Sequence, residues 1–255
     1  MEVTFLGTGT SQGVPLIGCQ CQVCLSTDLK DNRLRSSLLI NDKDCSFVID
    51  TGPDFRQQML RENVRQLDAV LFTHEHKDHI AGLDDVRAFN FIQSREMDVF
   101  ATSRVQDAIK REFAYIFSEE KYPGIPEIKL HTFDQQSFFI KHLQILPIDV
   151  MHYKMPVKAF RIGDFVYITD ANHISEKEKE KIKGAKIIVL NALRRHPHIS
   201  HYTLEEALHL IEEFKPEKAF LTHISHQLGK YEMVSSELPA NVFLAYDGLK
   251  IEITN

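Results

Sequence analysis

The chain has 255 residues, of which 43% are hydrophobic and 26% are charged, and its formal net charge is -6 at pH 7. This composition is typical of a globular protein with a packed core and excludes a largely disordered chain. The negative net charge argues against broad electrostatic binding to nucleic acids or anionic membranes, because such binding needs clustered lysine and arginine. We therefore expect one domain over residues 1–255 that acts on a small molecule rather than on nucleic acid.

The first residues have the pattern of a strand and lack a basic segment followed by an apolar stretch. No run of about 18 apolar residues occurs elsewhere, so we expect a cytoplasmic protein without a membrane span. The sequence leaves the oligomeric state open, a homodimer included, because apolar surface patches depend on the fold.

Short apolar segments rich in branched and aromatic residues recur along the chain with turn residues between them, a pattern that predicts β-strands. In chain order, the predicted strands are residues 3–6, 37–40, 47–49, 69–72, 99–101, 160–162, 165–169, 187–190 and 219–222. The dipeptide Gly163-Asp164 between two of them predicts a hairpin turn.

Two segments between the strands carry helix signals. Thr203 and Glu206 form a capping box, and apolar residues at intervals of three and four then predict an amphipathic helix over residues 204–214. Ser175 opens a charged helix that ends near Gly184. A chain of this length with helices between its strands can form one large α/β (α+β) domain or an all-β domain with added helices. The aromatic segment 113–126 is either core or one wall of a substrate pocket, and its spacing favours the core.

Acids and histidines follow four of the predicted strands directly. Asp50 follows strand 47–49, and His74, Asp170 and His223 each stand at or just beyond the end of a later strand. Rigid strands that end at one edge of a sheet can bring ligands that are distant in sequence to a single metal site. The pattern therefore predicts a metal site at the ends of these strands.

The segment after strand 69–72 is the strongest metal-binding signal. It places three imidazoles and a carboxylate within six residues, as His74, His76, Asp78 and His79. Imidazole and carboxylate together suit zinc, manganese or iron. The alternative is a solvated histidine-rich turn, but the acids and histidines at the later strand ends favour a metal site.

This His-x-His-x-Asp-His motif after a strand resembles the metallo-β-lactamase superfamily, and the resemblance extends over nearly the whole chain. It implies an αββα sandwich, with two central mixed β-sheets flanked by helices, and a hydrolase that holds two divalent ions, Zn²⁺ or Mn²⁺. In the family pattern, a histidine, an aspartate and a final histidine complete the site. By this resemblance, His74, His76 and His152 hold one ion, Asp78, His79 and His223 hold the other, and Asp170 bridges them.

The assignment of His152 has competitors in His131, His142 and His173, and it is favoured because His152 follows the apolar run 145–148. Asp170 could alternatively cap the next helix. However, a carboxylate buried after an apolar strand needs a cation nearby.

Two further aspartates are expected to support the ligands. Asp50 resembles the family's aspartate that orients a ligand histidine through its other ring nitrogen. Asp247, which precedes Gly248, is predicted to do similar work, with a simple turn as the alternative.

A second kind of metal site is predicted from Cys19, Cys21 and Cys24. Three thiolates so close together suit a structural zinc ion, which needs a fourth ligand, and His226 is the candidate. The alternative is that these cysteines are unmetallated thiols in a loop. Cys45 lies in an apolar segment and is expected in the core.

The cysteine cluster, the opening segment 6–15 and the segment 222–227 together look like the PhnP-type cyclic phosphodiesterases of phosphonate degradation. That resemblance implies that His201, together with Asp78, acts in catalysis. His201 is predicted as the general acid or as a hydrogen-bond donor to phosphate, with His196 and His198 as rivals.

The resemblance implies a small phosphodiester substrate, such as a cyclic ribose phosphate, attacked by a hydroxide that bridges the two ions. Three alternatives on the same fold are kept: a protein like pyrroloquinoline quinone biosynthesis protein B, a thioester hydrolase of the glyoxalase II type, and a tRNA 3′-processing endonuclease. A scaffold that has lost activity is disfavoured because no ligand of the set is missing. A redox diiron site is disfavoured because His76 is present.

Overall fold

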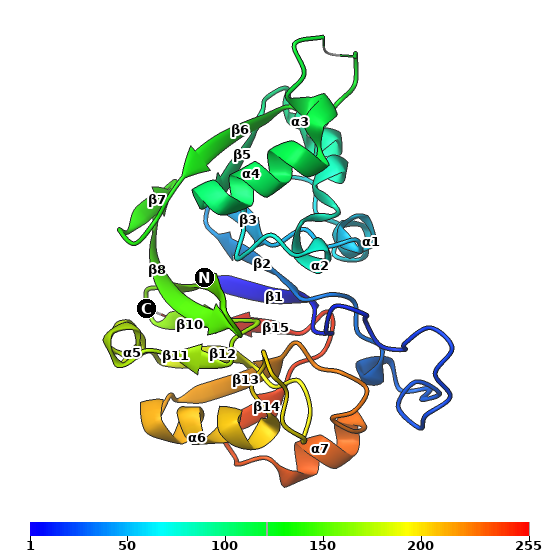
Figure 1. Ribbon diagram of the computed structural model, residues 1–255, viewed down its shortest axis with the longest axis vertical. Coiled ribbons are helices and arrows are strands. Elements are labelled where there is room, and N and C mark those ends of the chain that lie inside the picture. The colour runs from blue at the N-terminus through cyan, green and yellow to red at the C-terminus, as the bar shows by residue number, and fades with distance from the viewer. Residues whose placement is uncertain (121, 255) are drawn as a thin grey trace.

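Two β-sheets form the centre of the structure, and helices cover the outer face of each sheet (Figure 1). The computed structural model describes residues 1–120 and 122–254. The layers follow one another as helices, sheet, sheet and helices. This arrangement is the αββα sandwich that the sequence predicts, with mixed strand directions in both sheets.

The first sheet has seven strands. Neighbours from β15 to β3 pair antiparallel, and those from β3 to β6 pair parallel. In spatial order its strands are β15 (Lys250–Glu252), β1 (Glu2–Gly7), β2 (Ser37–Asp42), β3 (Cys45–Ile49), β4 (Ala69–Leu71), β5 (Met97–Ala101) and β6 (Ile128–Thr132).

The second sheet has eight strands, one of which, β7 (Phe138–Ile140), pairs only with β8 at the side of the main path. Its first four strands pair antiparallel, and the pairs from β10 to β14 are parallel. In spatial order the strands are β11 (His173–Ile174), β8 (Leu143–His152), β9 (Met155–Ile162), β10 (Phe165–Ile168), β12 (Ile187–Asn191), β13 (Lys218–Thr222) and β14 (Val242–Leu244).

Seven α-helices and three short 3-10 helices complete the described part of the chain. The first sheet is covered by α1 (Phe55–Arg61), α2 (Lys77–Ile80), α3 (Arg87–Gln93) and α4 (Ser103–Glu112), and the second by α5 (Glu176–Ile182), α6 (Leu204–Phe214) and α7 (Tyr231–Glu237). The 3-10 helices are η1 (Leu29–Asp31), η2 (Leu83–Val86) and η3 (Ala114–Ile116). None of the described helices is long and apolar enough to cross a membrane.

The strands read as continuous apolar runs because both of their faces are buried. In β10, Tyr167 points into the core between the sheets, whereas Val166 and Ile168 point toward the helices of the second sheet. In β4, Leu71 faces the other sheet and Val70 faces the helices of the first. Three apolar layers therefore hold the sandwich together, one between the sheets and one under each set of helices.

All nine predicted strands lie within or overlap observed strands, and both predicted helices are present as α5 and α6. The capping box of Thr203 and Glu206 is formed, and Gly163-Asp164 makes the turn between β9 and β10. The aromatic segment divides: Phe113 and Ile116 are buried with the helices of the first sheet, whereas Tyr115 and Tyr122 are exposed.

Candidate metal centre

Three of the polar residues at strand ends share an unusual backbone conformation. Asp50 follows β3, Asp170 lies two residues beyond the end of β10, and His223 follows β13; their φ angles are 66°, 54° and 54°. Left-handed backbone is uncommon for residues other than glycine and persists where surrounding contacts hold it. The conformation turns each side chain out of its strand toward a common point, which marks these positions as functional.

The histidine-rich loop follows β4 and continues into α2, which carries Asp78 and His79. This loop packs tightly against the turn after β3, where the Thr51 amide donates to the His79 carbonyl at 2.8 Å. A Cβ on Gly52 would lie 2.2 Å from the carbonyl oxygen of Asp78, so only glycine fits there. The close contact fixes α2 relative to the first sheet.

Ligand atoms of Asp78, His79, Asp170 and His223 all lie within 4.8 Å of one another. The His79 Nε2 atom is 3.1 Å from a carboxylate oxygen of Asp78 and 3.2 Å from one of Asp170. The His223 Nε2 atom is 3.3 Å from the other Asp170 oxygen. One small volume thus collects ligands from both sheets.

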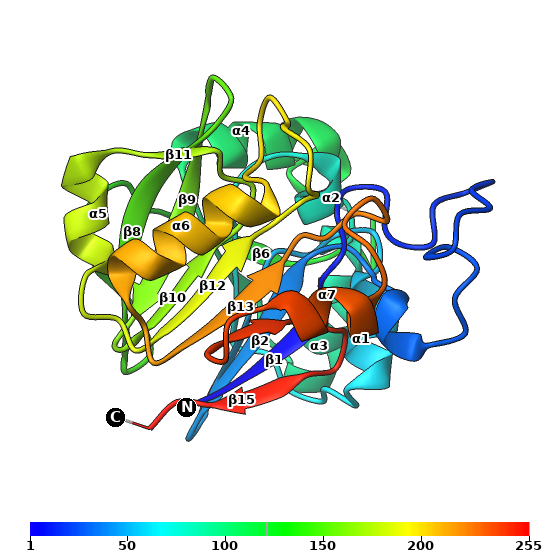
Figure 2. The same cartoon turned by 90° about the horizontal axis from the view of Figure 1, so that it is seen from below.

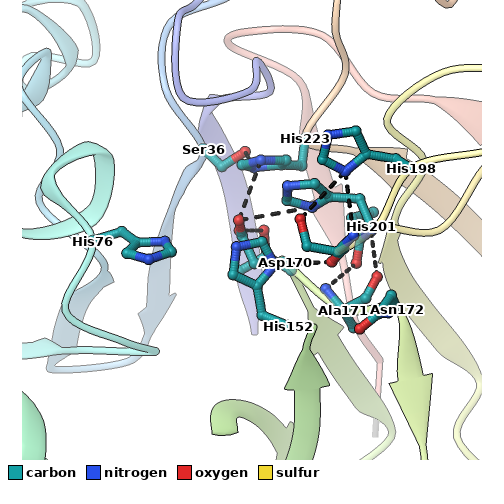
Figure 3. Close-up of polar contacts among 12 residues, drawn as sticks. Ser36, His76, His152, Asp170, Ala171, Asn172, His198, His201 and His223 are labelled. Carbon is teal, nitrogen blue, oxygen red and sulfur yellow. Dashed lines mark hydrogen bonds and ion pairs between the residues drawn. The ribbon is translucent and has the colours of Figure 1, made fainter. Parts of the chain in front are cut away.

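A second group of imidazoles lies beside the first. The His74 Nε2 atom is 3.1 Å from the His76 Nδ1 atom, and the ring centroid of His152 is 5.9 Å and 5.2 Å from those two rings. His152, Asp170 and His201 also offer ligand atoms within 4.8 Å of one another, so Asp170 lies between the two groups (Figure 3). The structure therefore brings together all seven residues that were predicted to hold two ions.

The hydrogen bonds of Asp50 fix the orientation of two imidazoles. Its carboxylate accepts from the Nδ1 atom of His79 at 2.7 Å and from the hydroxyl of Thr73 at 2.8 Å. Because the Thr73 hydroxyl donates to Asp50, its oxygen accepts from the His74 Nδ1 atom at 3.0 Å. Both histidines therefore carry hydrogen on Nδ1 and present the lone pair of Nε2.

The Nδ1 atoms of His152 and His223 are also hydrogen-bonded to acceptors, but to other residues. The Nδ1 atom of His152 donates to the carbonyl of Ser200 at 2.8 Å. The Ser36 hydroxyl donates to the carbonyl of Gly9 at 2.9 Å, which leaves its oxygen to accept from the His223 Nδ1 atom at 3.1 Å. Sequence reasoning missed Ser36 and Ser200, because neither stands in a motif.

These tautomers make the cluster unstable without a cation. The Nε2 lone pair of His79 faces carboxylate oxygens of Asp78 and Asp170, so acceptors face acceptors. Among the described residues, the buried Nε2 atoms of His79 and His223 have no hydrogen-bond partner. A buried polar atom left unpaired costs about 1–3 kcal/mol, and divalent ions satisfy such donor sets. The residues present thus fit two metal ions.

The pKa shifts of the buried histidine and aspartate also favour bound cations. Burial alone would lower the pKa of His79, but the carboxylates of Asp78, Asp170 and Asp50 raise it well above its ordinary value. Burial alone would raise the pKa of Asp170, but the imidazoles of His223 and His79 hold it well below its ordinary value. Three carboxylates around one buried ring, two of them also buried, require positive charge, which protons or metal ions can supply.

His201 lies beside this cluster, between two of the imidazoles. Its ring centroid is 4.6 Å from that of His152 and 4.8 Å from that of His223, and its Nδ1 atom is 3.9 Å from Asp170. Burial, together with the neighbouring His223, lowers the pKa of His201 to about 2. The rival His198 packs behind it at 5.1 Å between centroids, and His196 is exposed.

The other histidines that competed for the ligand role lie elsewhere. His131 and His142 each contact a carboxylate of their own, Asp98 at 2.5 Å and Asp42 at 2.9 Å. His173 is exposed on β11. The structure thus places His152, and none of these three, beside the cluster.

Asp247 does not orient a ligand histidine, in contrast to the prediction. Its carboxylate accepts from the amide and hydroxyl of Thr8, at 2.9 Å and 2.8 Å, and from the amide of Leu34 at 2.7 Å. The carbonyl of Thr8 in turn accepts from the Ile224 amide at 2.8 Å. Asp247 therefore stabilises the segment around Thr8, which contacts the backbone next to His223. It supports this ligand through that segment and not through the imidazole itself.

The predicted cysteine site is also assembled. The Nδ1 atom of His226 is 3.3, 3.4 and 3.6 Å from the sulfur atoms of Cys19, Cys21 and Cys24. Bonds of about 2.3 Å to sulfur and about 2.0 Å to nitrogen give such separations around one tetrahedral zinc ion. Cys45 is buried in the core, as expected.

A pocket of about 450 Å³ opens beside the second group of imidazoles, which contains His76 and His152. His76, His152 and Ser200 line it together with Arg104 and Lys154, and Arg104 is paired with Glu75 at 2.5 Å. The cationic Lys154 and Arg104 in this lining favour an anionic substrate. No residue of the aromatic segment 113–126 that the structure describes lines this pocket.

The comparisons with known proteins agree with this geometry. Residues 46–224 match the model of the family described as "Beta-lactamase superfamily domain". The chain belongs to the metallo-β-lactamase superfamily. Within that superfamily it resembles a diphosphatase from the PhnP family, with 37% sequence identity and a TM-score of 0.93 over 99% of this chain and 98% of the other.

Two further known proteins resemble this chain. Zn²⁺-bound PqqB from Methylobacterium extorquens has a TM-score of 0.78 over 99% of this chain and all of the other, and at 19% identity it shows the fold alone. A protein named octanoyltransferase from Porphyromonas gingivalis is 39% identical over 253 residues, which are 98% of this chain and 51% of that protein. The chain therefore spans about half the length of this relative.

Proposed function

We propose that the protein is a hydrolase of small phosphodiesters, cyclic ribose phosphates among them, that works with two divalent metal ions. The observation that carries the proposal is the set of four histidines whose Nδ1 atoms are all held by acceptors, which leaves their Nε2 atoms free for metal ions. The Nε2 atoms of His79 and His223 lie 3.2 and 3.3 Å from the Asp170 carboxylate. The likeness to a PhnP-family diphosphatase, which is named for a phosphate substrate, supports the substrate class.

His74, His76 and His152 would hold one ion, Asp78, His79 and His223 the other, and Asp170 would contact both. Two such ions lower the pKa of a bound water and neutralise charge on a phosphate. The protein's own part is to fix these ligands, through Asp50, Thr73, Ser36 and the Ser200 carbonyl, and to attract the anion to the pocket that Arg104 and Lys154 line.

We expect manganese- or zinc-loaded protein to hydrolyse bis(p-nitrophenyl) phosphate, and Asp170→Ala to lower the rate by about a thousandfold. Loss of a carboxylate shared by two ions removes several kcal/mol of charge stabilisation. Release of p-nitrophenolate measures the reaction. Asp164→Ala is the matched control, because Asp164 lies in the β9–β10 turn, and it should keep the rate. A metal-loaded wild type that leaves the diester intact would refute the phosphodiesterase proposal.

His201 is proposed to donate to the phosphate or to the leaving oxygen. Its ring lies against the cluster with a buried Nδ1 atom that has no partner in the described chain. His201→Ala should therefore lower kcat/KM by about tenfold or more, the loss expected for a hydrogen bond to a charged group. His198→Ala, on the same loop, should have a smaller effect. The reverse ranking of the two variants in the same assay would transfer the role to His198.

The three cysteines and His226 are proposed to hold one structural zinc ion. Protein treated with a chelator that empties the dinuclear centre should retain about one zinc per chain, measured by inductively coupled plasma mass spectrometry. Cys24→Ser should lose it, because a tetrahedral site needs all four ligands. Cys45→Ala serves as the control, since Cys45 lies in the core. Retention of zinc by Cys24→Ser would argue against this site.

Hydrolysis of an acyl thioester is the second candidate. It is favoured by the name octanoyltransferase of a relative that matches nearly all of this chain, although that name belongs to a protein of about twice the length. An octanoyl thioester belongs in the assay beside the phosphodiester. Turnover of the thioester alone would replace the first proposal with this one.

A further inference from the structure

The segment between Val14 and Arg33, which we call the cysteine arm, projects from the body of the protein (Figure 2). Its base is closed by two hydrogen bonds between Val14 and Arg33, at 2.9 Å and 2.7 Å. The arm has no apolar core of its own, because the large side chains of Ile17, Leu25 and Leu29 are 96%, 66% and 82% exposed. Something other than hydrophobic packing must therefore hold it in place.

The two halves of the arm meet the body differently. Near Arg33, the Asp31 carboxylate accepts from the Tyr231 amide at 2.7 Å, and Lys30 lies over the Tyr231 ring. Within the described chain, the polar contacts of residues 16–27 with residues outside the arm all go to the imidazole of His226, through the sulfur atoms of the three cysteines. The arm and the segment that ends at His226 are therefore fixed to each other through that cysteine and histidine site.

The segment 223–226 joins this site to the dinuclear centre. Its first residue, His223, belongs to the centre, and its last, His226, belongs to the arm. Between them, the Ile224 amide donates to the Thr8 carbonyl at 2.8 Å, and the Ile224 carbonyl accepts from the Thr10 amide at 3.1 Å. The two sites are thus three residues apart on a short segment that is hydrogen-bonded on both sides of Ile224.

His223 depends on such anchors more than an ordinary ligand does. Its backbone is left-handed, with a φ angle of 54°, a conformation that costs about 1–2 kcal/mol for a residue with a Cβ. Its Nδ1 atom is held by Ser36, which lies three residues beyond the base of the arm at Arg33. The stretches on both sides of the arm therefore contact the segment that carries His223.

We propose that zinc in the cysteine arm braces His223, so that the arm site and the second ion of the dinuclear centre bind cooperatively. This inference rests on the proposed function, because it requires both metal sites. His226 and Ser36 act as positioning residues: His226 fixes the segment from one end, and Ser36 holds the His223 ring. The ion held by His74, His76 and His152 does not depend on the arm.

The proposal predicts the selective loss of one ion. In manganese-loaded wild type, electron paramagnetic resonance should show a spin-coupled pair. In His226→Ala and Cys24→Ser, the affinity for the second manganese ion should fall about tenfold, the size of effect that supporting partners have on metal sites. At limiting manganese, the spectrum of an isolated ion should then replace that of the pair. Cys45→Ala should keep the pair.

Two further measurements separate bracing from general destabilisation. Ser36→Thr keeps the hydroxyl acceptor for His223 and should keep the pair, whereas Ser36→Ala should lose it. In the wild type, the affinity of the arm for zinc, measured by competition with a chelator, should rise by the same factor when manganese is added, because coupling between two sites is reciprocal.

The outcomes distinguish this inference from the proposed function. A wild type that shows no coupled pair contradicts the dinuclear centre itself, and the brace with it. A wild type with a coupled pair that persists in both arm variants at limiting manganese, and zinc affinity that manganese does not change, contradicts the brace and leaves the phosphodiesterase proposal standing.

Discussion

The orientation of four imidazoles is the constraint on which the rest of the site depends. A histidine can serve a metal through either ring nitrogen, and the partner of the other nitrogen decides which one is free. Here, Asp50, Thr73, Ser36 and the Ser200 carbonyl occupy the Nδ1 atoms of His79, His74, His223 and His152. The four Nε2 atoms are consequently left free, and those of His79 and His223 face the buried Asp170 carboxylate, which needs positive charge nearby.

The sandwich brings these groups together from both sheets. Asp50, His74 and His79 belong to the first sheet and its connections, whereas His152 and Asp170 belong to the second. The apolar layer between the sheets sets their separation, so that ligand positions are fixed by packing far from any metal. The left-handed backbones at Asp50, Asp170 and His223 are the local strain that this arrangement requires.

Much of the fold and of the ligand set can be predicted from the sequence, for physical reasons. Strands such as β10 and β12 are buried on both faces and read as unbroken apolar runs. The motif from His74 to His79 is local, so its spacing alone indicates a metal site. By contrast, β6 is half exposed and gives a weak pattern, and it was missed.

The supporting partners could not be predicted so well. Ser36 lies 187 residues from His223 in the chain and stands in no motif. The carbonyl of Ser200 is backbone, so no residue type marks it. The prediction that Asp247 orients a ligand histidine was wrong, because its carboxylate accepts from the amides of Thr8 and Leu34. A carboxylate before glycine indicates a turn, but it does not indicate which amide the carboxylate contacts. Interactions between distant segments depend on the packing of the whole sandwich.

The most direct test of this account is anomalous X-ray diffraction from crystals of the protein purified with its zinc and soaked in manganese. The account predicts two manganese peaks on either side of the Asp170 carboxylate, each against Nε2 atoms of the histidines described above. It also predicts one zinc peak among Cys19, Cys21, Cys24 and His226. A single peak or none beside Asp170, at full occupancy of the soak, would contradict a dinuclear centre.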